Sequence, residues 1–232
     1  LFRSIRYMQA VILAAGKGLR LRPFTEKHPK PLIPVANKPL LKYTLETLPD
    51  SITEIIIVIG YLGKQVQDYL GDSWNGKPIK YVVQENLVGT GDALLQAKDL
   101  LGKNFLVVNG DDLYSKDDLT ALLKYPYSIL AWQSTVAYEF GLNVLENMQL
   151  VGFDPESTLM NCGAYHLSKE FFKDELAEIT VRDKTEYSLP HTLVNIALHD
   201  KVMVVPATHW FPVGTPAQHI FADGYYVRRN KS

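Results

Sequence analysis

The residues best suited to chemistry lie in the stretch LAAGKGLRLRPFTEKHPKPL, between positions 13 and 32. Gly16 and Gly18 follow an apolar run, and a glycine turn after a strand can present backbone N–H groups to phosphate oxygens. Positions 16–42 hold seven Lys or Arg residues but one acid, Glu26. Arg adds bidentate hydrogen bonds to phosphate, Lys adds a compact charge, and prolines restrict the loop. The pattern predicts a polyphosphate site, with a solvated basic surface as the alternative.

A dinucleotide site of the Rossmann type does not fit this loop. Such a site needs a third glycine that opens a helix and an acidic residue about 20 positions later. Leu21 stands where that glycine is needed, and Pro23 follows it. The next apolar run ends in Gly60 and Tyr61 and not in an acid. The loop is therefore not expected to bind NAD-like cofactors.

Two further blocks place polar side chains beside apolar runs. In VVNGDDLYS, Asp111 and Asp112 follow a buried strand, where they can form a turn or offer oxygen ligands to Mg²⁺. In YVVQENLVGTGDALL, the amide of Gln84 offers a donor and an acceptor, the complement of a pyrimidine imide edge. The same block also fits a strand, a turn and the start of a helix.

Strands and helices that position these blocks alternate along the chain. Apolar runs predict strands at 8–15, 54–60, 79–84, 104–110, 128–133, 141–146, 161–167 and 201–207. Helical patterns fall at 39–48, 63–71, 91–101, 116–124, 188–200 and 215–226. This alternation is typical of an α/β doubly wound sheet.

The chain is expected to form one domain. Residues 8–226 contain no low-complexity segment or long linker, and about residue 136 the rhythm changes to shorter strands with fewer helices between them. We therefore expect a first half at about 8–135 and a second at about 136–226. Residues 1–7 are expected to be an extraneous remnant or a misassigned start without a functional role, and 227–232 a polar, frayed tail.

Bulk composition excludes several classes of protein. The net charge of -1 in 232 residues favours neither nucleic acid nor a membrane as partner. Cys162 is the only cysteine, so a disulfide framework within the chain is excluded and a reduced, cytoplasmic setting is the default. No apolar run approaches the roughly 18 residues needed to cross a bilayer.

The first block resembles the signature of the sugar-1-phosphate nucleotidyltransferases, closest in motif to glucose-1-phosphate thymidylyl- and uridylyltransferases. That signature reads G-x-G-x-R-x-x-P, then Thr, then P-K-P, and here it is matched by Gly16, Gly18, Arg20, Pro23, Thr25, Pro29, Lys30 and Pro31. The resemblance covers most of residues 8–220. It implies a Rossmann-like, mostly parallel mixed sheet with helices on both faces.

The resemblance also implies roles for individual residues. Arg20, Lys30 and Asp111 are expected to be catalytic, with Asp111 as the Mg²⁺ ligand and Asp112 as an outer or structural residue. The expected nucleotide-binding residues are Leu13, Ala15, Gly16, Lys17, Gly18, Gln84, Gly89 and Thr90. The spacing of Gln84 to Gly89 and Thr90 favours UTP or dTTP. The expected sugar-binding residues are Gly141, Asn161 and Glu186, with Tyr165 completing the N-x-G-x-Y match, and His191 is expected to be structural.

Two of the departures from the family pattern matter for chemistry. Asp154, within Phe153-Asp154-Pro155, replaces a lysine that binds the sugar phosphate, and Pro212 replaces an aspartate that is a second metal ligand. No hexapeptide repeat follows.

The resemblance implies that a nucleoside triphosphate and a sugar-1-phosphate give an NDP-sugar and pyrophosphate. Two alternatives stay open: a non-catalytic or weakened relative that binds nucleotides for regulation, and an enzyme acting on another phosphorylated alcohol such as phosphocholine. The oligomeric state is also left open.

Overall fold

The computed structural model describes residues 8–181 and 183–229, so residues 1–7, expected to have no functional role, lie outside the described residues. Its centre is a mixed eight-stranded sheet. In spatial order the strands are β15 (Met203–Pro206), β9 (Ser128–Gln133), β12 (Leu159–Ser168), β7 (Asn104–Asn109), β1 (Gln9–Ala14), β4 (Glu54–Ile59), β6 (Lys77–Val83) and β5 (Ser73–Trp74). Only β12 and β5 run antiparallel to their neighbours in this sheet.

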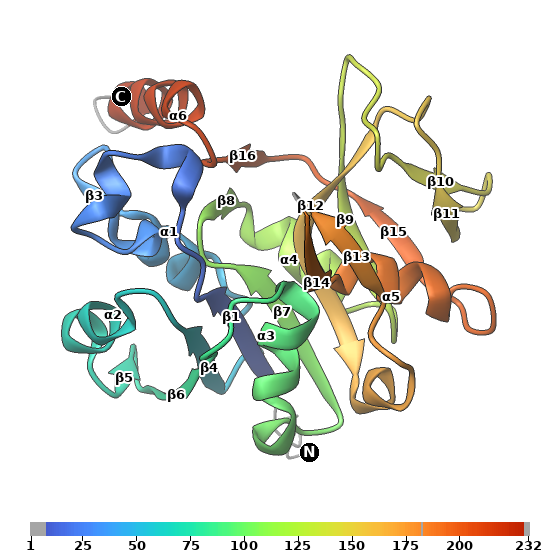
Figure 1. The fold of residues 1–232 in the computed structure, drawn as a ribbon, viewed down its shortest axis with the longest axis horizontal. Helices are drawn as coiled ribbons and strands as arrows, with labels where there is room; N and C mark the ends of the chain where they lie inside the picture. The colour runs from blue at the N-terminus through green and yellow to red at the C-terminus, as the bar shows by residue number, and fades with distance from the viewer. Residues whose placement is uncertain (1–7, 182, 230–232) are drawn as a thin grey trace, which may run out of the picture.

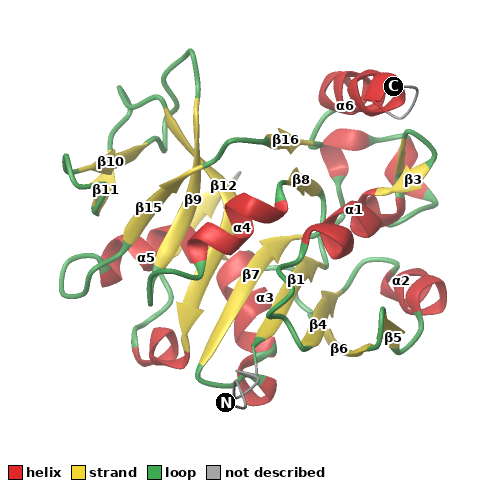
Figure 2. Ribbon diagram, turned by 180° about the vertical axis from the view of Figure 1, so that it is seen from behind, coloured by secondary structure: helices red, strands yellow, loops and turns green. Residues whose placement is uncertain are grey.

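Helices cover both faces of the sheet, as Figures 1 and 2 show from opposite sides. The helices are α1 (Leu40–Thr47), α2 (Gly63–Leu70), α3 (Thr90–Gln96), α4 (Lys116–Leu122), α5 (Leu189–Ile196) and α6 (Pro216–Arg229). Side chains of β1 alternate between two cores: Val11 packs with residues of α3 and α5, and Ile12 with residues of α1, α2 and α4. This confirms the predicted α/β sheet with helices on both faces.

Four small two-stranded sheets surround the main one. They are formed by β2 (Pro34–Val35) with β3 (Lys38–Pro39), β8 (Asp112–Tyr114) with β16 (Trp210–Pro212), β10 (Leu142–Val144) with β11 (Leu150–Phe153), and β13 (Glu178–Val181) with β14 (Lys184–Tyr187). The predicted strand at 141–146 is therefore real but lies outside the main sheet. The other short strands escape prediction because two to four residues give no readable periodicity.

The last helix continues beyond its predicted end. The α6 helix ends at Arg229, so residues 227–229, predicted to begin a polar tail, are helical, while 230–232 lie outside the described residues. Aromatic contacts support its last turns: the ring of Tyr225 lies 4.7 Å from that of Phe211, and the Tyr226 hydroxyl lies 2.9 Å from His209 Nε2. Arg228 and Arg229 also complement the negative end of the helix dipole. None of the helices in the described residues is long and apolar enough to span a membrane.

The carboxylate of Asp118 ties α4 to the segment between β15 and β16. It is 3% exposed and accepts hydrogen bonds from the backbone N–H groups of Thr208 and His209 at 2.9 and 3.0 Å. Hydrogen bonds to a charged group each contribute about 1.5–3 kcal/mol. We expect Asp118→Ala to lower the free energy of unfolding in urea by about 2–4 kcal/mol. The matched control is Asp117→Ala on the same helix, where the side chain is exposed and a change within about 0.5 kcal/mol is expected. Equal losses in the two variants would contradict this role.

Candidate active site

The predicted phosphate loop follows β1, and the predicted metal residue, Asp111, follows the adjacent strand β7. The β1 strand lies between β4 and β7, so successive strands are added on one side of β1 and then on the other. Such a switch point leaves a crevice at the carboxyl ends of the strands, where α/β proteins bind ligands. The N–H of Gly110, just after β7, donates to the carbonyl oxygen of Leu13 in β1 at 2.9 Å. The loops that follow the two strands therefore start from adjacent points.

The loop after β1 is folded tightly on itself by three single-turn 3₁₀ helices, at Leu19–Leu21, Phe24–Glu26 and Lys30–Leu32. Gly18 has φ of 61°, and a Cβ atom there would lie 2.9 Å from Thr25 Cγ2 and 3.1 Å from Lys30 Cβ. The hydroxyl of Thr25 donates to the carbonyl oxygen of Gly18 at 2.8 Å. Glycine at 18 is therefore required both by its backbone angle and by close packing of the loop.

The predicted nucleotide-binding residues of this loop differ in exposure. Gly16, Lys17 and Arg20 are exposed, Leu13 and Gly18 are half-buried, and Ala15 is buried. A Cβ at Gly16 would meet no atom within 4 Å, which leaves its backbone open to a ligand. The guanidinium of Arg20 lies near Gly214, where a Cβ atom would be 3.3 Å from Arg20 Nη2. The segment Val213–Gly214 thus reaches the loop, a contact that the sequence analysis did not predict.

Lys30 and Asp111 form an ion pair between the two loops. Their side chains are 11% and 28% exposed, so the pair is largely shielded but reachable from solvent. The resemblance predicts that Lys30 binds the phosphates and that Asp111 binds the metal. The structure brings these two of the three residues predicted to be catalytic into direct contact.

Asp112 lies behind this pair on the short strand β8, opposite Pro212 of β16. Burial raises the pKa of its carboxyl to about 7, and the negative charge of Asp111 adds to the rise. The ammonium of Lys30, the amide of Asn109 and the N–H of Val213 oppose that shift. Asp112 is thus a buried carboxyl within a strand pair, and its structural or outer role stays a prediction.

Gln84 is buried at the end of β6, and its side chain is already engaged. Its Nε2 donates to the carbonyl oxygen of Gly89 at 3.1 Å and to Asp92 Oδ2 at 2.7 Å. Both partners are acceptors, which fixes the orientation of the amide. The expectation that Gln84 offers a donor and an acceptor to a base needs correction, because both of its hydrogens are used within the protein. Only its oxygen can accept from a ligand.

Gly89 and Thr90 join the first half of the chain to the second half. Gly89 has φ of 104°, and a Cβ atom there would lie 2.3 Å from the carbonyl oxygen of Tyr187. The N–H of Tyr187 donates to Val88 O at 2.7 Å, and the N–H of Leu189 donates to Thr90 Oγ1 at 3.2 Å. The glycine in this predicted base-binding segment is thus required by packing against Tyr187.

Two of the predicted sugar residues have structural partners within the protein. Asn161 Nδ2 donates to the hydroxyl of Tyr165 at 2.8 Å, and its oxygen accepts from Gly163 N at 2.9 Å. A Cβ atom at Gly141 would lie 2.5 Å from the carbonyl oxygen of Ser157, so this glycine allows two loop segments to pack closely. Glu186 is half-buried on β14, one residue before the Tyr187 that contacts Gly89.

One departure from the family pattern, Asp154, directly follows Phe153, which forms an aromatic cluster with Phe140 and His191. The Phe153 and His191 ring centroids are 4.5 Å apart, and Phe140 lies 6.0 and 5.4 Å from them. His191 Nδ1 also lies 2.7 Å from Ser188 Oγ, and burial lowers the pKa of the imidazole. Asp154 Oδ1 accepts from Glu156 N at 2.9 Å, so its carboxylate stabilises its own turn.

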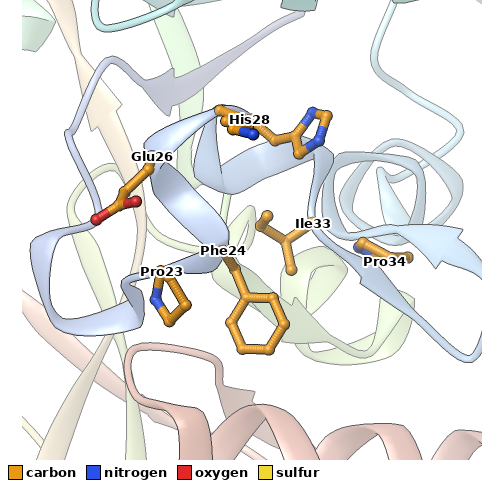
Figure 3. A pocket seen from close by; sticks show the side chains of 7 residues that line it. Pro23, Phe24, Glu26, His28, Ile33 and Pro34 are labelled. Atoms are coloured by element: carbon orange, nitrogen blue, oxygen red, sulfur yellow. The ribbon is translucent and has the colours of Figure 1, made fainter.

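A pocket of about 560 Å³ lies against the phosphate loop (Figure 3). It is lined by Pro23, Phe24, Glu26, Lys27, His28, Ile33 and Pro34. Arg20, Lys30 and Asp111 are not among the lining residues. The pocket therefore lies beside the loop and is separate from the ion pair at the switch point.

The fold and this site define an α/β protein with a glycine-rich, basic loop and a lysine–aspartate pair at the switch point of its sheet. The sequence model of the nucleotidyl transferase family matches residues 9–138, and the chain belongs to that family. The chain spans about half the length of the curated relatives it matches.

Several proteins are similar to this chain in sequence, and others are similar to it in structure. The bifunctional protein GlmU of Methanocaldococcus jannaschii is 36% identical over 95% of this chain and 54% of its own length. The UTP–glucose-1-phosphate uridylyltransferase AglF of Haloferax volcanii is 38% identical over 47% of this chain and 45% of its own. A solved putative glucose-1-phosphate thymidylyltransferase from Bacillus anthracis has a TM-score of 0.79 at 24% identity, covering 95% of each chain. The UDP-glucose pyrophosphorylase of Acinetobacter baumanii has a TM-score of 0.81 at 17% identity, covering 97% of each chain. The two structures share the fold.

The contact between Gly89 and Tyr187 gives a direct test of how the two halves are joined. We expect Gly89→Ala to lower the free energy of unfolding by about 2–4 kcal/mol, since both its φ and the 2.3 Å approach to Tyr187 O oppose a Cβ atom. Urea unfolding measures the change. Gly76→Ala is the matched control, because that glycine also has positive φ, at 77°, but a Cβ there would meet nothing within 4 Å. Equal destabilisation of both variants would show that backbone angle alone matters.

Proposed function

We propose that the protein transfers a nucleotidyl group from UTP or dTTP to a sugar-1-phosphate, giving an NDP-sugar and pyrophosphate. The observation that carries the proposal is the Lys30–Asp111 pair at the switch point, beside an open glycine loop, in a member of the nucleotidyl transferase family. An oxygen of the sugar phosphate forms a bond to the α-phosphorus of the nucleotide. The bond from that phosphorus to the oxygen bridging to the β-phosphorus breaks, and pyrophosphate leaves.

The proposed chemistry needs alignment and charge neutralisation more than proton transfer. The attacking sugar phosphate is already an anion, so no general base is required. Lys30 and Arg20 would neutralise charge on the triphosphate, and the backbone at Gly16 would hold its oxygens. Because the loop is already folded around Gly18 and Thr25, little reorganisation is needed when the nucleotide binds.

The donor groups at the site suit a Mg²⁺ ion that arrives with the nucleotide. Within the described residues, no group of three or more His, Cys, Asp or Glu side chains could hold a metal by itself. Magnesium commonly takes one or two protein carboxylates and completes its shell with phosphate and water oxygens. Asp111 would supply the protein carboxylate, and the bound ion would supply charge neutralisation at the phosphates.

The preference for a pyrimidine imide rests on the free oxygen of Gln84. Because Asp92 and Gly89 take both amide hydrogens, the remaining group is an acceptor. Uracil and thymine carry an N3–H that can donate to it, whereas the corresponding nitrogen of cytosine carries no hydrogen. This arrangement supports UTP or dTTP as the nucleotide.

A second acceptor class is favoured by the composition of the second half. Residues 125–168 contain no Lys or Arg and four acids, at positions 139, 146, 154 and 156. The aromatic cluster of Phe140, Phe153 and His191 lies beside this acidic segment, and Phe140 is 41% exposed. Aromatic rings with nearby carboxylates attract ammonium groups. A phosphate ester with a cationic end, such as phosphocholine or an amino sugar phosphate, is therefore the second candidate acceptor.

The proposal predicts pyrophosphate release with UTP or dTTP, Mg²⁺ and an acceptor from a panel of hexose-1-phosphates, amino sugar phosphates and phosphocholine. Lys30→Gln should lower kcat/KM by about 10²–10³, because it removes one positioned charge. The matched control is Lys27→Gln, since Lys27 is exposed on the same loop and should leave the rate nearly unchanged.

The same panel separates catalysis from regulation by binding. Nucleotide binding in a calorimeter without turnover on any acceptor would favour the non-catalytic alternative. Neither binding nor turnover with a folded protein would reject the proposed function.

Pro212 offers a second test, because it lies in register with Asp112 on the strand pair behind Asp111. We expect Pro212→Asp to lower the Mg²⁺ concentration needed for half-maximal rate by about tenfold, since a second carboxylate becomes available to the ion. Pro212→Ala separates this gain from the simple loss of the proline ring. An identical Mg²⁺ dependence in the two variants would contradict the expectation.

A further inference from the structure

The C-terminal helix α6 contacts the segment that carries the predicted catalytic residues, although the two are about 185 residues apart in sequence. In Figure 1 α6 lies above β3 and the N-terminal loops, and in Figure 3 it runs, in faint red, below Phe24. The helical pattern at 215–226 predicts this helix, but nothing in the sequence indicates a role for it.

Two hydrogen bonds join α6 to the hairpin β2–β3, which follows Lys30 closely. His219 Nε2 donates to the carbonyl oxygen of Pro34 at 2.7 Å. Asp223 Oδ1 accepts from the N–H of Ala36 at 2.8 Å. Ala36 and Asn37 have φ of 47° and 64°, so the hairpin turn has the left-handed geometry of a two-residue type I′ turn. The bond from Asp223 holds the first residue of that turn.

Apolar and ring contacts strengthen the same interface. Ala222 is fully buried in a small core with Leu21, Ile33 and Val35. The ring of His219 lies 5.5 Å from that of Phe24, in the middle 3₁₀ turn of the phosphate loop. Leu21 directly follows Arg20, so this small core and the predicted phosphate residues share one short segment of chain.

The hairpin is connected to Lys30 by a short, hydrogen-bonded path. The N–H of Ile33 donates to the carbonyl oxygen of Lys30 at 3.0 Å, and the N–H of Leu40 donates to the carbonyl oxygen of Ile33 at 3.1 Å. A displacement of Pro34 would therefore be transmitted to Lys30 through a single turn of chain. Misplacing a reacting or neutralising group by about 1 Å can cost about 10² in rate.

We propose that His219 and Asp223 are positioning residues, which hold the loop carrying Arg20 and Lys30 in its catalytic geometry from the opposite end of the chain. They act through the β2–β3 hairpin and not by touching substrate. The two side chains lie one turn apart on the helix face that meets the hairpin, while Ile220 of the same helix is 71% exposed. One face of the helix thus contacts the hairpin, and another face, which carries Ile220, is exposed to solvent.

Kinetics with single and double variants test this role, and this part of the test rests on the proposed function. We expect the double variant His219→Ala/Asp223→Ala to lower kcat about ten- to a hundredfold, with little change in the KM for the acceptor. Asp223→Asn keeps a side-chain oxygen that can accept from Ala36 N, and it should retain nearly wild-type kcat where Asp223→Ala does not. Ile220→Ala is the matched control and should leave kcat unchanged.

A second measurement does not depend on turnover. Lys27 is exposed in the phosphate loop, so its rate of cleavage by trypsin reports how firmly the loop is held. We expect faster cleavage after Lys27 in the double variant and in Asp223→Ala, and a wild-type rate in Asp223→Asn and Ile220→Ala. If the wild-type protein shows no turnover, the proposed function fails while this measurement still decides the positioning role.

Several results would overturn the positioning role. They are a wild-type cleavage rate in the double variant, equal cleavage in Asp223→Asn and Asp223→Ala, or an increase shared by Ile220→Ala. With an active enzyme, a wild-type kcat in the double variant would overturn it as well. Circular dichroism of each variant shows whether it is folded, and the single variants replace the double variant if that one is not.

Discussion

The contact between Lys30 and Asp111 is the interaction on which the site depends. Each residue lies in a loop that leaves an adjacent parallel strand, and the two are 81 positions apart in sequence. Two opposite charges that are only 11% and 28% exposed attract each other more strongly than a surface pair would, because water screens them less. The pair joins the phosphate loop to the carboxyl end of β7, so the glycine turn and the acid face the same space.

This pairing also explains how a loop with many positive charges can keep an ordered structure. A cluster of positive charges repels itself, and its stability depends on what it packs against. Here Lys30 is neutralised by Asp111, Leu21 is buried under α6, and the hydroxyl of Thr25 holds Gly18. Arg20 and Lys17 remain exposed, which leaves their charges available for an anionic ligand. The loop is therefore structured by its inner residues and open at its outer ones.

The sequence predicted well what depends on local pattern and poorly what depends on distant contacts. Long apolar runs located the strands that contribute most to the main sheet, and Gly16 and Gly18 located the tightly folded loop that follows β1. Nothing in the sequence indicated that Gly89 would pack on the backbone of Tyr187, since that approach arises only when two halves of the fold meet. The same holds for Gln84, whose amide hydrogens are taken by Asp92 and Gly89. The sequence shows that a glutamine side chain has both donor and acceptor atoms, but only the fold shows which of these atoms are already hydrogen-bonded within the protein.

The two departures from the family pattern now have different physical meanings. Asp154 caps its own turn through Glu156 N, so its acid is a feature of loop geometry and need not face an anionic substrate. Pro212 lies in a strand pair with Asp112, a carboxyl whose pKa burial has raised to about 7. A second ionised carboxylate at position 212 would add like charge beside Asp111 and Asp112, and it would be favourable only with a cation between them. Proline at 212 removes that repulsion and leaves Lys30 as the partner of Asp111. The charges of Lys30 and Asp111 thus balance each other at the switch point, while residues 125–168 of the second half contain no Lys or Arg.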